Sequence, residues 1–224
     1  MSLRVAVGAV FRREMQLFAR RKSDWANPLM FFLIVCSLFP FAVGSESERL
    51  KLIGIGVIFV GALLAAMLSL PRLFDEDARD GSLELLLTSP EPLAVLILAR
   101  VAALSLALGV ALAVVSPVFA LFYALPGDVA AMLALTVAMA VPTLLLVGAI
   151  AAALLVSARG GAILTAVLVL PLTIPTLIFG AVAALRVLYG ESPAAELALQ
   201  AAFMLLALAL CPLAAAAALK ISTD

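Results

Sequence analysis

The chain has 224 residues, of which 66% are hydrophobic and only 12% are charged, and its mean hydropathy is +1.27. A soluble domain carries roughly 25% charged residues, so this composition excludes a soluble protein and indicates an integral membrane protein. The 14 basic and 14 acidic residues balance, so no basic field is available to attract a nucleic acid. We therefore expect one transmembrane domain, 1–224, whose surroundings are the lipid bilayer.

The N-terminal segment, 1–24, alternates apolar and basic residues with the period of a helix. Its apolar face carries Val7, Phe11, Met15 and Phe18. This pattern predicts an amphipathic helix that lies flat at the membrane surface, with its arginines turned towards the lipid headgroups. A positively charged tail without this helix is the alternative interpretation.

Six apolar segments follow, and each is long enough to cross about 30 Å of hydrocarbon at about 1.5 Å per residue. They lie at 25–43, 50–70, 93–123, 129–156, 161–185 and 194–219. Arg100, near the start of the third segment, is expected to extend its side chain to the membrane surface. Pro171 and Pro175 lie in the fifth segment, with Phe179 one turn further on. They predict either a broken helix beside a translocation path or a kink that serves packing.

Lysine and arginine are distributed unequally between the two sides that this topology defines. Eleven of the 14 lie before the first span, in or beside the loop 71–92, in the fourth connection or after the last span. The other three are Arg49, Lys51 and Arg186. Because basic residues concentrate on the cytoplasmic side, both termini and the loop 71–92 are predicted to be cytoplasmic.

The loop 71–92, which we call the acidic loop, is the one long hydrophilic connection between spans. It holds six of the chain's 14 carboxylates: Asp75, Glu76, Asp77, Asp80, Glu84 and Glu91. A solvated connector would also be charged, which gives a plain alternative to any binding role. A calcium site is disfavoured, because the acidic residues lack the spacing of a calcium-binding loop.

A short helix is predicted inside the acidic loop. The dipeptide Asp80-Gly81 indicates a turn, and Asp80 or Ser82 can cap the helix that follows. Glu84 near the helix N-terminus suits the helix dipole, and Pro90 ends the helical stretch. The helix would lie outside the bilayer and make about two turns at 3.6 residues per turn.

One side of this short helix is apolar. Its stripe consists of Leu83, Leu86 and Leu87, at the spacing i, i+3, i+4. A leucine stripe outside the bilayer needs a partner with a groove to bury it, and the coupling helix with which an ABC transporter permease docks on its ATPase has this form. We expect the leucines to contact the ATPase and the neighbouring residues to position the helix: Asp77, Asp80, Gly81, Ser82 and Glu84.

The stretch 73–84, followed by Leu86-Leu87 and Ser89-Pro90, resembles the cytoplasmic loop of the haem exporter B family. These proteins are the membrane permeases of the cytochrome c maturation ABC transporter. Three further blocks resemble the same family: Asn27-Pro28-Leu29 with Leu38-Phe39-Pro40, Leu170-Pro171-Leu172 with Ile174-Pro175 and Leu177–Gly180, and Pro212 with Ala215-Ala216. All four blocks occur in order relative to the six spans. Leu85 stands where members of the family tend to have a glutamine.

The resemblance implies an all-α permease of the bacterial inner membrane, with six spans and the exporter-type coupling helix. It implies two copies of the chain with two soluble ATPase subunits that bind ATP and Mg, a haem-handling membrane protein and a small single-span subunit. ATP hydrolysis would drive haem export or the release of a haem-loaded chaperone. The chain itself would be neither an enzyme nor the holder of a cofactor.

Two features are absent from the sequence, as expected if other subunits bind ATP and haem. The chain has no GxxxxGK[ST] motif for ATP phosphates and no histidine, the common axial ligand of haem iron. A permease for a polysaccharide or a drug is the alternative within the same class, and a purely structural membrane scaffold is the alternative outside it. A scaffold would have no use for a docking helix.

Overall fold

The computed structural model describes residues 3–20, 23–44, 47–156 and 161–223, and all regular elements in these ranges are helical. Of the basic residues that set the orientation, Arg21, Lys22 and Arg159 lie outside the described ranges. The elements are α1 (Leu3–Arg20), α2 (Ser23–Val43), α3 (Ser47–Ser69), the 3-10 helix η1 (Leu70–Leu73), α4 (Asp75–Asp80), α5 (Ser82–Leu87), α6 (Leu93–Leu104), the π-helix η2 (Ser105–Gly109), α7 (Val110–Phe122), α8 (Gly127–Leu154), α9 (Gly161–Leu188) and α10 (Ala194–Thr223).

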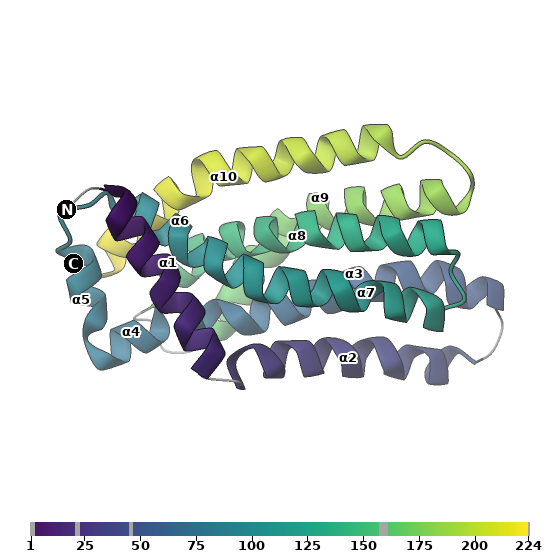
Figure 1. The fold of residues 1–224 in the computed structure, drawn as a ribbon, viewed down its shortest axis with the longest axis horizontal. Helices are drawn as coiled ribbons and strands as arrows, with labels where there is room; N and C mark the ends of the chain where they lie inside the picture. Colours follow the sequence, from purple (N-terminus) through teal and green to yellow (C-terminus); the bar gives the residue numbers. More distant parts are fainter. Residues whose placement is uncertain (1–2, 21–22, 45–46, 157–160, 224) are drawn as a thin grey trace.

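Among the described residues, six helical stretches are long and apolar enough to cross a membrane. They are Ala26–Val43, Glu48–Asp80, Leu93–Phe122, Gly127–Leu154, Leu164–Leu188 and Ala194–Ser222. The prediction of an all-α membrane protein with six spans is therefore confirmed. Figure 1 shows the long helices side by side, with both termini, α4 and α5 at one end of the bundle and α1 running obliquely across it.

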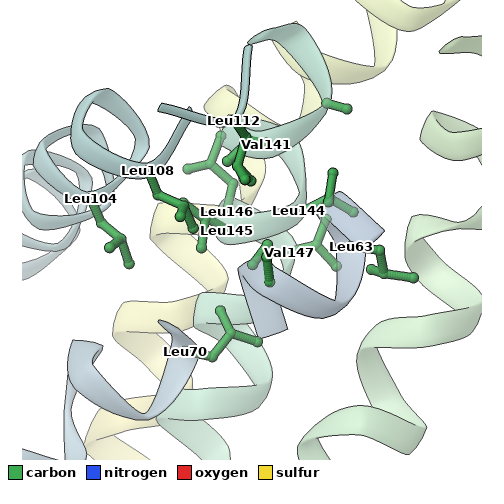
Figure 2. Packing of buried hydrophobic residues seen from close by; sticks show 14 of the residues in the cluster. Leu63, Leu70, Leu104, Leu108, Leu112, Val141, Leu144, Leu145, Leu146 and Val147 are labelled. Atoms are coloured by element: carbon green, nitrogen blue, oxygen red, sulfur yellow. The ribbon is translucent and has the colours of Figure 1, made fainter. Parts of the chain in front are cut away.

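Helix α8 lies at the centre of the bundle and packs against α7, α9, α10 and α3. Its inward side chains meet a line of leucines from the third span, Leu104, Leu108 and Leu112 (Figure 2). Gly148 of α8 lies so close to η1 that a Cβ atom would approach the Leu70 side chain to 2.4 Å. Close packing through small residues is the main source of helix association in lipid, where apolar side chains gain little by leaving their surroundings.

The helical irregularity of the third span was not predicted. Between α6 and α7 the chain forms a π-helix, Ser105–Gly109, which contains no proline. Helix α9, in contrast, continues from Gly161 to Leu188 through Pro171 and Pro175. A continuous α9 fits the packing interpretation of these prolines better than a broken helix.

Near the end opposite to the termini, α3 and α7 approach each other at Gly54. The Tyr123 side chain is fully buried there, and its hydroxyl donates a hydrogen bond of 2.8 Å to the carbonyl oxygen of Cys36 in α2. A Cβ atom on Gly54 would lie 2.4 Å from Cγ of the Tyr123 ring. This glycine therefore makes room for an aromatic ring that links three spans.

We expect Gly54→Ala to lower the melting temperature of the purified protein in detergent, because Tyr123 must shift and overpacking costs about 1–3 kcal/mol. Gly56→Ala is the matched control, since a Cβ atom there meets nothing within 4 Å. The control should be neutral or stabilising, because alanine favours a helix over glycine by up to about 1 kcal/mol. Equal melting temperatures for the two variants would contradict this packing.

Candidate functional site

The acidic loop folds into two short helices joined at Gly81. Gly81 has a φ of +78°, in the left-handed region that glycine adopts without strain. The Asp80 carboxylate accepts a hydrogen bond of 2.9 Å from the backbone N–H of Ser82, and α5 then runs from Ser82 to Leu87. The predicted turn and the short helix are thus confirmed, whereas the predicted cap is wrong: Gly81 is the N-cap residue, and neither Asp80 nor Ser82 makes a side-chain cap hydrogen bond.

Helix α4, on the other side of Gly81, was not predicted. It begins at Asp75 and carries three carboxylates in its first turn, where acidic side chains interact favourably with the helix dipole. These three neighbouring carboxylates were the signal in the sequence from which the start of α4 could have been predicted. Together, η1, α4 and α5 connect α3 to α6 at the end of the bundle that holds both termini (Figure 1).

A buried guanidinium joins this loop to the rest of the molecule. The Arg100 side chain of α6 is 5% exposed and donates a hydrogen bond of 2.7 Å to the carbonyl oxygen of Leu73. It also forms an ion pair with Asp77 of α4, and its Nε lies 3.4 Å from Oε1 of Glu14 in α1. We call Arg13, Glu14, Asp77 and Arg100 the Arg100 cluster; it brings α1, α4 and α6 to one point.

The charges of the Arg100 cluster compensate one another. Arg13 lies on its half-exposed side, with a guanidinium nitrogen 3.5 Å from Oδ1 of Asp77. Burial raises the pKa of Glu14 from its ordinary value of 4.5, because the loss of solvation outweighs the attraction of Arg100 and Arg13. The folded protein therefore binds a proton on the Glu14 carboxyl more tightly than the unfolded chain does. The contribution of Glu14 to the free energy of unfolding is fully present below the carboxyl's ordinary pKa and is lost as the pH rises through its raised pKa.

The expectation that Arg100 extends to the membrane surface is wrong. The side chain turns into the protein because two carboxylates and a carbonyl oxygen supply its partners there. A buried charge is tolerated only when it is paired and hydrogen-bonded. Asp77, expected beside the ATPase, is itself 8% exposed, so its carboxylate is already engaged within the chain.

The packing also revises which leucines of α5 are accessible. Leu83 is 5% exposed and belongs to the main core, while Leu86 and Leu87 are half-buried against that core. Leu85, which the stripe pattern left out, is 75% exposed. The exposed surface of the two short helices, which we call the α4–α5 face, consists of Glu76, Ala78, Arg79, Asp80, Gly81, Glu84, Leu85 and Thr88.

The residues predicted for a translocation path lie elsewhere, in the membrane-spanning part of α9. Pro171 is exposed, whereas Pro175 and Phe179 are half-buried. An apolar cavity of about 320 Å³ separates the start of α9 from α2 and α3, with Leu170 and Pro71 in its lining. None of the three predicted residues lines this cavity, and a role in translocation stays a prediction.

We expect Arg100→Leu to lower the melting temperature in detergent strongly, because removing one partner of a buried ion pair costs about 3–5 kcal/mol. Arg12→Leu removes an exposed arginine of α1 that is outside the Arg100 cluster, and it should change the melting temperature little. The two variants lose the same charge and differ mainly in burial. A small, equal effect would show that the Arg100 cluster does not hold this end together.

The chain is similar to known proteins over the whole of this site. Residues 5–222 match the model of a family described as CcmB protein. The chain is 47% identical over 210 residues to Heme exporter protein B of Pseudomonas aeruginosa, with 94% of each chain covered. It is 44% identical over 214 residues to the protein of that name in Paracoccus denitrificans, covering 96% of this chain and 98% of the relative.

The protein of the same name in Escherichia coli K12 is 42% identical over 214 residues, which cover 95% of this chain and 97% of the relative. The matched region includes α1 from residue 5 onwards, the acidic loop and all six spans. With near-complete coverage by the family model and by several relatives, the chain belongs to the CcmB family.

Proposed function

We propose that the chain is the membrane permease subunit of an ABC transporter that exports haem for cytochrome c maturation in the bacterial inner membrane. Its family membership and the name of its relatives, Heme exporter protein B, support the substrate and the pathway. The α4–α5 face supports the role of the chain within the transporter. The end that carries this face and both termini is cytoplasmic, in keeping with the positive-inside rule.

The observation that carries the docking role is Leu85. This side chain is 75% exposed on a short helix at the end of the bundle, outside the apolar spans. Glu84 beside it is exposed as well, and Asp80 lies at the exposed joint between the two helices. An apolar side chain with an acidic rim fits an amphipathic helix-in-groove contact with a soluble protein.

The chain has no motif for ATP phosphates, so ATP and Mg bind to the partner ATPase, and the permease supplies no catalytic residue. Two permeases act with two ATPases. When the ATPases close around ATP, they push on α4 and α5. Because Asp77 and the Leu73 carbonyl are bonded to Arg100, that push reaches α6 and the third span.

The haem step itself involves further subunits. With no histidine in the chain, the common axial ligand for haem iron comes from the haem-handling membrane protein, which acts with the small single-span subunit. Movement of the spans then exports haem or releases a haem-loaded chaperone. The α9 residues Pro171, Pro175 and Phe179 are the candidates for the part of the spans that moves.

We expect Leu85→Asp to abolish co-purification of the ATPase and cytochrome c maturation while the permease is still inserted. Loss of an interface residue worth about 2 kcal/mol weakens binding roughly 30-fold, and a carboxylate in an apolar contact adds a desolvation cost. Ala19→Asp adds the same charge at an exposed position of α1 that is outside the α4–α5 face, and it should retain the ATPase.

Each readout tests a separate part of the proposal. Retention of the ATPase by Leu85→Asp would contradict docking through the α4–α5 face. Loss of the ATPase with normal cytochrome c maturation would instead indicate a permease for another substrate, such as a polysaccharide or a drug.

A further inference from the structure

A groove of about 400 Å³ lies between α1 and α5, beside the α4–α5 face. One wall is formed by α1 and the other by α5, with α6 behind them. The apolar lining comes from Ala6, Ala9, Val10, Leu85, Leu86 and Leu96. Leu85, the exposed leucine of the proposed docking face, is thus also a rim residue of this groove.

The Arg100 cluster holds the α1 wall of the groove against α6 and against α4, the helix that precedes α5. Arg13 and Arg100 both line the groove, and their ion pairs with Asp77 and Glu14 tie α1 to α4. Helix α1 also packs along α6. The groove is therefore a fixed feature between two segments that are far apart in the sequence.

The shape and the chemistry of the groove fit a protein side chain. On the α1 side the lining includes two alanines, whose small side chains leave room for a bulky apolar group. Buried Arg100 and half-exposed Arg13 are both paired with carboxylates, so they leave little net charge inside. The hydroxyl of Ser82, which also lines the groove, is buried and has no hydrogen-bond partner in the protein.

The charge around the groove selects between protein and lipid. Glu84 is exposed next to Leu85, and Asp80 precedes α5 at the exposed joint. Carboxylates at the rim repel anionic lipid headgroups and attract lysine or arginine. Arg13 lines the α1 wall with about half of its side chain exposed, so the groove has a basic edge on α1 and an acidic edge on α5. A partner helix that carries an apolar side chain between charged neighbours of both signs is complementary to the groove and to both edges, whereas an anionic lipid headgroup is repelled by the α5 edge.

We propose that α1 forms the second wall of the ATPase docking surface, with an apolar side chain from a helix of the ATPase inserted between α1 and α5. The inserted residue is flanked by charged side chains of both signs, which face the acidic edge on α5 and the basic edge on α1. This inference rests on the proposed function, and it assigns to α1 a contact that the sequence pattern placed at the lipid headgroups. A push from the ATPase then acts on α1 and α5 together.

The test uses single cysteines and a maleimide label on the full-length permease, alone and in complex with its ATPase in nanodiscs. Both native cysteines, Cys36 and Cys211, are buried, so labelling reports on the introduced residue. Ala9→Cys places the thiol in the groove, and Ala19→Cys places it on an exposed part of α1 that does not line it. Neither change adds bulk that would disturb the fold.

We expect the ATPase to slow labelling of Ala9→Cys on the order of tenfold, the factor that corresponds to about 1.4 kcal/mol, and to leave Ala19→Cys unchanged. Unchanged labelling of Ala9→Cys in the complex would overturn the inference. Slow labelling in nanodiscs without the ATPase, but fast labelling in detergent, would also overturn it and identify lipid as the occupant.

A bulky substitution separates failure of this inference from failure of the proposed function. Ala9→Phe fills the groove and should release the ATPase, whereas Ala19→Phe should not. If Leu85→Asp releases the ATPase and Ala9→Phe retains it, docking on α5 stands and the role of α1 falls. If both variants retain the ATPase, the proposed docking function falls as well.

Discussion

A guanidinium buried in the protein must have its charge compensated and its N–H groups hydrogen-bonded, and this requirement organises the functional end of the molecule. Arg100 meets most of this requirement, because it forms ion pairs with Asp77 and Glu14 and donates hydrogen bonds to Asp77 and to the carbonyl oxygen of Leu73, while its Nε makes no hydrogen bond. These groups belong to α4, α1 and η1, so one side chain of α6 fixes three other segments. Removing a carboxylate from this arrangement weakens the compensation of a buried charge, which costs more than the loss of a surface ion pair.

The exposed surface of the acidic loop follows from this arrangement. Once Asp77 is held by Arg100, α4 presents its opposite side to solvent. The left-handed joint at Gly81 then directs Leu83 into the core and leaves Leu85 outside. The carboxylates of the acidic loop therefore have two roles. Asp77 anchors the loop to Arg100, while exposed carboxylates such as Glu84 border the apolar residue Leu85. A permease that transmits force from an ATPase needs both an anchored loop and an accessible contact.

The spans and the helix α5 were predictable because local patterns determine them. Each span is a long apolar run that only a helix can carry through lipid, and α5 follows from the turn at Asp80-Gly81. The burial and ion pairing of Arg100 were not predictable, because its partners Asp77 and Glu14 lie far away in the sequence. The leucine stripe identified a helix but not which side faces the protein, and the π-helix at Ser105 carries no proline to mark it.

The central claim, that the α4–α5 face meets the ATPase through Leu85, is tested most directly by photo-crosslinking in the intact complex. A photoreactive amino acid would be placed at position 85 or, as the buried comparison, at position 83. Position 85 should give an adduct with the ATPase, and position 83 should give adducts within the permease. An ATPase adduct from position 83, with none from position 85, would contradict the arrangement of the loop around Arg100.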